Sequence, residues 1–158
     1  AIVDATGCMV FDEGLYDPAN EPDIAYPYLF SYFKGEEWRT QKETQRLLDK
    51  YFTTKPDGIP GNDDTGTMSS WAIFNMIGFY PDCPGLPEYT LTTPVFDKVT
   101  IRLDPKWYKE KELVIESNRA QPGTLYINKV LLNGKKFNKY RITHDELVHG
   151  QHIYFDLK

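Results

Sequence analysis

The sequence has few cysteines, no long apolar run and no excess of basic residues. Cys8 and Cys83 are the only cysteines among 158 residues, which excludes a disulfide framework and a cysteine-rich zinc site. No apolar stretch approaches the ~20 residues that a membrane-spanning helix needs, and no signal peptide opens the sequence. Acidic residues outnumber basic ones by 23 to 18, so nucleic acid is not the expected main partner. The hydrophobic content of 41% favours a globular protein or a piece of one.

The two halves of the chain differ in charge and in hydrophobic period. Residues 1–85 carry 14 acidic and 6 basic residues (net −8), whereas residues 86–158 carry 9 acidic and 12 basic residues (net +3). Apolar residues recur at helical spacing in the first half and alternate in the second. Between them, residues 80–87 contain three prolines and a glycine, which end a helix and do not fit inside a sheet. We predict an α+β chain, with a helical segment followed by an antiparallel, sandwich-like β region.

Three helices are expected in the first half. An apolar stripe at helical spacing predicts the first helix between Pro22 and Gly35, and a second stripe predicts a helix over 38–52. The other face of the second helix is charged and is expected to be solvated; it consists of Lys42, Glu43, Arg46, Asp49 and Lys50. The third helix, over 66–79, is apolar nearly all round and is therefore expected to be buried on most sides.

Local signals in the second half predict short strands. Apolar and polar residues alternate there with the period of half-buried strands, over 98–103, 112–116 and 152–157. The dipeptide Asn133-Gly134 accepts positive φ at both positions of a tight turn, so a β-hairpin is expected at that point. Thr143 and Glu146 have the spacing of a capping box at the start of a short helix.

An acidic, glycine-rich turn precedes the third predicted helix. Residues 56–66 contain two prolines and three glycines, and Asp63 and Asp64 lie side by side near its end. The free N–H groups of a helix N-terminus would keep a carboxylate ionised and fixed in direction, as a general base acting on water requires. The alternative is that Asp63 or Asp64 only caps the helix. On the residues alone, capping is favoured.

A second acidic turn, over 17–23, precedes the first predicted helix. Asn20 offers an amide oxygen and Glu21 a carboxylate, and calcium prefers hard ligands of this kind. The spacing does not match the twelve-residue calcium loop with its central glycine and terminal glutamate. A helix start whose acidic residues complement the helix dipole is the favoured alternative.

Several runs of the sequence occur in an order that resembles a known family. They are Asn20-Glu21-Pro22, Tyr28-Leu29-Phe30, Trp38-Arg39-Thr40-Gln41, residues 56–71, Gly78-Phe79-Tyr80-Pro81, Pro84-Gly85, Pro87-Glu88-Tyr89 and residues 94–99. Together they resemble glycoside hydrolase family 92, from about Asn20 to the C-terminal end. The run Gly-Asn-Asp-Asp…Gly…Met-Ser…Trp within 61–71 is the most specific part of the resemblance.

Members of this family are calcium-dependent exo-α-mannosidases that invert the anomeric centre. The resemblance therefore implies an α-1,2-mannosidase-like activity that removes terminal α-linked mannose from glycans. It also implies that the chain is a C-terminal fragment of such an enzyme. On this basis, residues 1–85 are expected to form the last helices of an (α/α)6 catalytic barrel, and residues 86–158 a C-terminal β domain.

The resemblance also implies roles for residues of the two acidic turns. By position, Asp64 is the best match to the catalytic base, with Asp63 second and Asn62 supporting it at the substrate. Glu21, with Asn20 beside it, falls where the family holds its calcium.

One catalytic element of the family is missing from this sequence. The general acid lies in a Glu-Gly-Asn-type motif upstream of the Asn-Glu-Pro run; no such motif occurs here, and Glu13 is too close to Asn20 to replace it. The chain alone is therefore expected to be inactive, and to pair with the missing N-terminal part of the same enzyme or with another copy. The family suggests a periplasmic or secreted location. The alternative is a non-catalytic carbohydrate-binding or interaction module whose acidic turns only cap helices.

Overall fold

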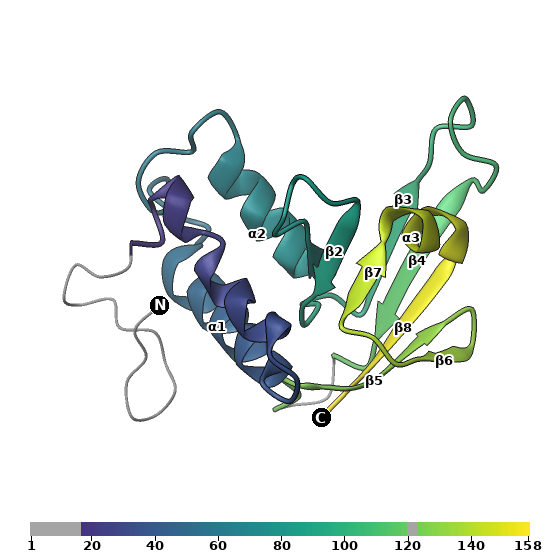
Figure 1. Ribbon diagram of the computed structural model, residues 1–158. Helices are drawn as coiled ribbons and strands as arrows, with labels where there is room; N and C mark the ends of the chain where they lie inside the picture. Colours follow the sequence, from purple (N-terminus) through teal and green to yellow (C-terminus); the bar gives the residue numbers. More distant parts are fainter. Residues whose placement is uncertain (1–16, 120–122) are drawn as a thin grey trace.

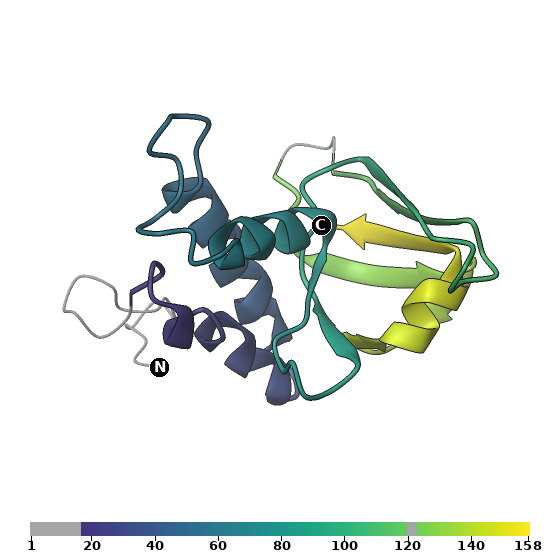
Figure 2. The same cartoon turned by 90° about the horizontal axis from the view of Figure 1, so that it is seen from above.

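A computed structural model describes residues 17–119 and 123–158, so Cys8 and Glu13 lie outside the described residues. Helices occupy the first part of the chain and strands the second, and Figures 1 and 2 show most of the helices to one side of the sheets. The α+β class predicted from the sequence is confirmed. Among the described residues, no helix is long and apolar enough to span a bilayer.

The elements are short, and the longest described helix, α1, has 15 residues. In chain order they are η1 (Glu21–Asp23), η2 (Tyr26–Tyr32), α1 (Glu37–Tyr51), α2 (Thr67–Ile77), β1 (Phe79–Tyr80), β2 (Glu88–Leu91), β3 (Lys98–Arg102), β4 (Glu112–Ser117), β5 (Ile127–Leu132), β6 (Lys135–Phe137), β7 (Arg141–Thr143), α3 (His144–Gly150) and β8 (His152–Leu157). Elements of this length are stabilised mainly by packing against one another.

The first predicted helix is not an α-helix. Its residues form two 3₁₀-helices instead, η1 and η2, each with a proline in its first two positions. Pro22 and Pro27 are only five residues apart, and a proline inside an α-helix removes a hydrogen bond and clashes with the preceding turn. The predicted stripe is also only partly buried: Tyr28 is fully buried, whereas Phe33 is 64% exposed.

The second helix is confirmed as α1, but its charged face is not uniformly solvated. Leu47 and Leu48 are buried as expected. Glu43, which was expected in solvent, is 0% exposed and pairs with Arg46 through Nη2 and Oε2 at 2.6 Å. The prediction was wrong for Glu43, because tertiary packing covers more of the helix than its apolar stripe, including Thr40, Gln41, Thr44 and Gln45.

The third helix, α2, ends two residues earlier than predicted. Gly78 stops it with φ of 115°, a left-handed conformation that glycine adopts without strain. The following residues, Phe79 and Tyr80, form strand β1. Most of the helix is buried or half-buried, but Ile73 is 57% exposed, and the buried Asn75 hydrogen-bonds to the Tyr28 hydroxyl.

The strands of the described residues form two sheets. Strands β1, β2 and β7 form an antiparallel sheet, and the second sheet has the order β3-β4-β8-β5-β6. In the second sheet β8 is parallel to β4, so the prediction of a purely antiparallel region was wrong. The reason is topological: β7 belongs to the other sheet, and α3 brings the chain back so that β8 enters beside β4 (Figure 1).

The two local predictions in this region are confirmed. Asn133 and Gly134 have φ of 50° and 74° and connect β5 to β6 in a tight hairpin. Thr143 and Glu146 form the predicted capping box at the start of α3, with side-chain to backbone bonds in both directions.

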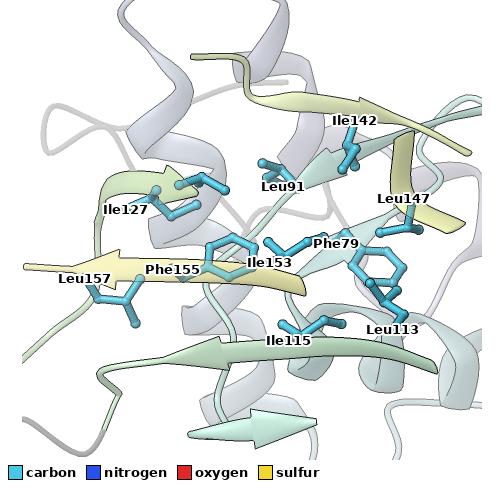
Figure 3. Packing of buried hydrophobic residues seen from close by; sticks show 11 residues of the cluster. Phe79, Leu91, Leu113, Ile115, Ile127, Ile142, Leu147, Ile153, Phe155 and Leu157 are labelled. Atoms are coloured by element: carbon cyan, nitrogen blue, oxygen red, sulfur yellow. The ribbon is translucent and has the colours of Figure 1, made fainter. Parts of the chain in front are cut away.

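The main apolar core lies between the two sheets and α3 (Figure 3). Its buried members are Phe79, Leu91, Leu113, Ile115, Ile127, Val130, Ile142, Leu147, Ile153, Phe155 and Leu157. A smaller core under the helices contains Tyr28, Leu47, Leu48, Trp71 and Ala72. The regions are joined by a hydrogen bond from the Ile127 N–H to the Gln41 side chain, 2.9 Å long, and by pairing of β1 with β2. The domain boundary at residue 85 stays a prediction.

Candidate active site

The acidic turn before α2 has an unusual backbone. Asp64 and Thr65 have φ of 46° and 60°, and Gly61 and Gly66 flank them with φ of 63° and 93°. The left-handed region costs a residue with a side chain about 1–2 kcal/mol, and a β-branched threonine is rarely found there. Two such residues in succession need strong local support, which comes from the first turn of α2.

Asp63 supplies part of this support by accepting N–H groups at the start of α2, although the N-cap position itself is Gly66. Its carbonyl accepts hydrogen bonds from the Gly66 and Met68 N–H groups at 3.1 and 3.2 Å. Its carboxylate oxygen Oδ1 accepts from the Ser69 N–H at 2.8 Å. The capping interpretation that the sequence favoured therefore describes Asp63.

Asp64 is arranged differently from its neighbour. Its carboxylate is exposed and accepts no hydrogen bond from the described part of the chain. Its carbonyl accepts from the N–H and the hydroxyl of Thr67, at 3.3 and 2.8 Å. The backbone of Asp64 is thus held while its side chain stays free to interact with water.

The second acidic turn has a compact hydrogen-bonded form. The Asn20 N–H donates to the Asp17 carbonyl at 3.1 Å, and the Asp23 N–H donates to the Asn20 carbonyl at 2.9 Å. The side chains of Asn20 and Glu21 are exposed. This turn leads directly into η1 and leaves its two oxygen-bearing side chains at the surface.

The two acidic turns, which are about 40 residues apart in sequence, are in contact (Figures 1 and 2). A Cβ atom added to Gly61 would lie 2.7 Å from the Cβ of Ala19, so the two backbones approach as closely as glycine allows. The Thr67 hydroxyl lies 2.8 Å from Glu21 Oε1 and 2.8 Å from the Asp64 carbonyl. The structure therefore brings both predicted turns into one site; Asn62 belongs to the same turn and is exposed.

The sequence analysis missed two residues of this site. Thr67 makes the contact between the turns, and nothing in its local sequence distinguishes it from an ordinary first residue of a helix. Tyr80 lies close enough to be influenced by Glu21: burial raises the pKa of its phenol, and the negative charges of Asp82 and Glu21 raise it further. Its ring stacks on Tyr28 at 4.8 Å. Tyr80 belongs to the run Gly78-Phe79-Tyr80-Pro81, and this run is the sequence feature that could have identified it.

The described residues can supply part of a calcium coordination shell. Calcium takes six to eight oxygen ligands. No group of three or more His, Cys, Asp or Glu side chains in the described ranges is placed to hold a metal ion. The Glu21 carboxylate and the Asn20 amide oxygen are exposed donors of the right chemistry, and the Glu21 carboxylate keeps free lone pairs beyond its bond to Thr67. They fit calcium as contributors to a larger set of ligands.

The chain is similar to known proteins of one family. The family model for the glycosyl hydrolase family 92 catalytic domain matches residues 5–158. A GH92 α-mannosidase from Bacteroides thetaiotaomicron, solved with mannoimidazole, is 32% identical with a TM-score of 0.78, over 89% of this chain and 18% of its own. A GH92 inverting mannosidase from the same organism is 35% identical with a TM-score of 0.79, over 93% of this chain and 19% of its own.

A curated relative is described as a glycosidase. An uncharacterized secreted glycosidase of Arthroderma benhamiae is 29% identical over 139 residues, which is 88% of this chain and 18% of that protein. The chain thus spans about a fifth of the length of the relatives that it matches. Because the family model covers almost the whole chain, and the solved relatives share its fold at over 30% identity, the chain belongs to glycoside hydrolase family 92.

Proposed function

We propose that the chain is the C-terminal part of an exo-α-mannosidase that removes terminal α-linked mannose from glycans with inversion, and that Asp64 is its general base. The observation that carries the proposal is the division of roles between neighbouring aspartates. The Asp63 carboxylate accepts a helix N–H, whereas the exposed Asp64 carboxylate accepts no hydrogen bond from the described residues, and Thr67 links the Asp64 carbonyl to Glu21. A carboxylate without such a bond has all its lone pairs open to water, which favours Asp64 over Asp63 as the general base.

In this proposal, Asp64 removes a proton from the attacking water. An inverting glycosidase separates its acid and its base by roughly 6.5–9.5 Å so that water fits on the far face of the sugar. Asp64 lies on a backbone fixed by Thr67, with Asn62 two residues away as a hydrogen-bonding group for the substrate. The acid that protonates the leaving group would come from the part of the enzyme that precedes this chain.

Glu21 and Asn20 would contribute oxygen ligands to calcium. When bound, a calcium ion supplies a positive charge that holds sugar hydroxyls and favours distortion of the ring toward the transition state. Glu21 is kept in place for this role by the Thr67 hydroxyl at 2.8 Å, and Asn20 by the backbone bonds of its turn. The remaining ligands would be water, substrate or the rest of the enzyme.

Exposed apolar side chains support a larger assembly. Leu29, Tyr32, Phe33 and Ile73 in the helical region are between 43% and 64% exposed. A fragment is expected to lack cover either over Trp71, Phe74 and Ile77 or over the apolar stripe of the first helix; Trp71 is buried and Phe74 and Ile77 are half-buried, so the exposed surface is mainly that of the stripe. We propose that the preceding helices of an (α/α)6 barrel cover these exposed apolar side chains. The 158 residues alone would then lack turnover. The whole enzyme would act outside the cytoplasm. The secreted relative supports this location.

One surface favours the second candidate function, a carbohydrate-binding module. A groove of about 400 Å³ is lined by Trp38, Tyr126 and Tyr140, together with Gln41, Ile127 and Lys158. Exposed aromatic rings are suited to stacking on sugars. Trp38 lies near the start of α1, whereas the acidic turns lie beyond its end, so binding at the two places can be separated by mutation.

The base assignment is tested in the complete protein that contains this chain. Asp64→Asn removes the basic oxygen and is expected to lower kcat by about 10²–10⁴-fold with little change in thermal stability. Asp63→Asn is the matched variant: its amide oxygen can still accept from Ser69, so it is expected to reduce kcat far less. If Asp64→Asn keeps wild-type turnover, Asp64 is not the base.

Calcium titration in the presence of mannose separates the two candidate functions. Under the mannosidase proposal, Glu21→Ala abolishes calcium-dependent mannose binding and Tyr140→Ala leaves it intact. Under the binding-module alternative, Tyr140→Ala abolishes sugar binding and Glu21→Ala has no effect.

A further inference from the structure

The Thr67 hydroxyl is the direct polar contact between the two acidic turns. Its oxygen lies 2.8 Å from Glu21 Oε1, on η1, and 2.8 Å from the carbonyl of Asp64. We propose that Thr67 is a positioning residue, which sets the direction of the Asp64 carboxylate and the place of Glu21 relative to it. The proposal rests on the proposed function of Asp64 and Glu21 and adds the residue that couples them.

A hydroxyl has only one proton for its two oxygen partners. A hydrogen bond to a carboxylate is charge-assisted and stronger than one to a carbonyl. The proton of the Thr67 hydroxyl is therefore shared between Glu21 Oε1, which is the stronger acceptor, and the Asp64 carbonyl, which also accepts from the Thr67 N–H at 3.3 Å. Through these two donors a single residue bonds to both acidic turns.

Asp64 depends on this contact because its backbone is held at positive φ. The direction of its side chain follows from the φ of 46°, and Thr65 behind it is also left-handed. Within the described residues, the Asp64 carbonyl receives its hydrogen bonds from Thr67 alone. When the hydroxyl is lost, the carbonyl keeps only the longer bond, and the turn can relax toward an ordinary conformation that redirects the carboxylate.

The position of Thr67 is fixed by helix α2. It is the first residue of α2, and the next turn of that helix is anchored by Met68 and Trp71, which are 0% and 3% exposed. A β-branched side chain also has fewer accessible rotamers than serine, so the hydroxyl is held near one direction. The rigid helix is thus linked to the exposed acidic groups through this side chain.

The test compares Thr67→Val, Thr67→Ser and the control Ser70→Ala in the complete protein. Valine keeps the shape of threonine without the hydroxyl, and serine keeps the hydroxyl. Ser70 is exposed on the same helix turn, and its side chain makes no hydrogen bond to the described residues. Two quantities are measured: kcat at saturating mannoside, and the calcium dissociation constant by isothermal titration calorimetry without substrate.

Thr67→Val is expected to lower kcat and to weaken calcium binding, each by about 10–100-fold, as loss of a residue that orients a ligand does. Thr67→Ser is expected to keep most of the wild-type kcat and calcium affinity, and Ser70→Ala is expected to match the wild type in both. A residue with a merely structural role would lower the melting temperature and leave the calcium constant of the folded protein unchanged.

The outcomes separate this inference from the proposed function. If Asp64→Asn is inactive but Thr67→Val matches the wild type in kcat and calcium affinity, the positioning role is wrong and the base assignment stands. If Thr67→Val and Thr67→Ser lose kcat and calcium affinity equally, the positioning role is also wrong, because the loss then does not come from the missing hydroxyl. If the wild type binds no calcium, the calcium assignment fails, and Thr67 is judged by kcat alone.

Discussion

The interior between the sheets and the interior beneath the helices are made of different residues. Between the sheets and α3, eleven buried residues form a continuous apolar cluster (Figure 3). Beneath the helices, α1 buries five polar or charged side chains besides its two leucines. Asn75 of α2 is also fully buried and hydrogen-bonds to Tyr28. One region is held by non-directional apolar burial and the other by directed polar contacts.

This difference indicates that the two regions contribute differently to stability and to the orientation of side chains. Apolar burial supplies free energy but does not fix the direction of individual groups. Hydrogen bonds are directional and can specify how an element is oriented. The acidic turns contact the helical region, where Glu43 is buried with an ion pair to Arg46 and its Oε1 has no hydrogen-bond partner within the described residues. We therefore expect mutations between the sheets to change stability, and mutations near the helices to change geometry.

The largest effect is expected from Phe155→Ala in β8. Phe155 is 0% exposed at the centre of the sheet core, and removal of such a side chain leaves a cavity that costs about 3–5 kcal/mol. Urea unfolding measures the loss. Tyr154→Ala, on the opposite face of the same strand, is the control and is expected to cost less. A loss below about 1 kcal/mol at Phe155 would show that the sheets do not depend on this core.

A smaller effect is expected from Tyr28→Phe in the helical core. The change keeps the ring but leaves the buried Asn75 side chain without its tyrosine partner, at a cost of about 1–3 kcal/mol. Tyr140→Phe is the control, because Tyr140 is 38% exposed and lies away from this pair. Both are measured by urea unfolding. If the two variants lose the same stability, the polar contact does not stabilise the helical region.

Gly61→Ala tests the contact between the acidic turns. The new Cβ would have to displace Ala19, whose Cβ would be 2.7 Å away, and the residue would be strained at φ of 63°. Gly35→Ala has a similar strain at φ of 90° but open space around it, so it is expected to lose about 1 kcal/mol and Gly61→Ala more than that. Calcium titration should distinguish them: only Gly61→Ala is expected to weaken binding. Equal calcium affinities would mean that close packing of the turns is not required.

The features that the sequence predicted correctly are local. Asn133 and Gly134 determine their hairpin by their own φ preferences, and Thr143 and Glu146 form a capping box at fixed spacing. The two acidic turns were also recognisable, because each carries its side chains within a few residues. Their juxtaposition was not: Glu21 and Thr67 are 46 residues apart, and no local pattern encodes that contact.

The errors arose where tertiary packing overrides periodicity. The stripe between Pro22 and Gly35 has helical spacing, but two prolines break the α-helix into 3₁₀ turns. Glu43 has the position of a solvated residue on a helical wheel, but it is buried in the folded chain. The parallel pairing of β4 with β8 depends on the crossover through α3, which alternation of apolar residues does not reveal.

The smallest effect is expected from Glu146→Gln at the start of α3, far from the acidic turns. Hydrogen bonding from Lys139, and then from the Thr143 backbone, lowers the pKa of Glu146 below its ordinary value. A carboxyl group whose pKa is lower in the folded state stabilises the protein above its unfolded pKa of about 4.3, and loses this contribution as the pH falls through the folded value. Because the Glu146 side chain is partly exposed to solvent and glutamine preserves the capping box, the variant should lose at most about 0.5 kcal/mol at pH 7. Thermal unfolding from pH 7 to pH 3 should show the gap to the wild type closing in acid. A gap that stays constant with pH would mean that the charge of Glu146 does not stabilise the β region, whose stability then rests on its apolar core.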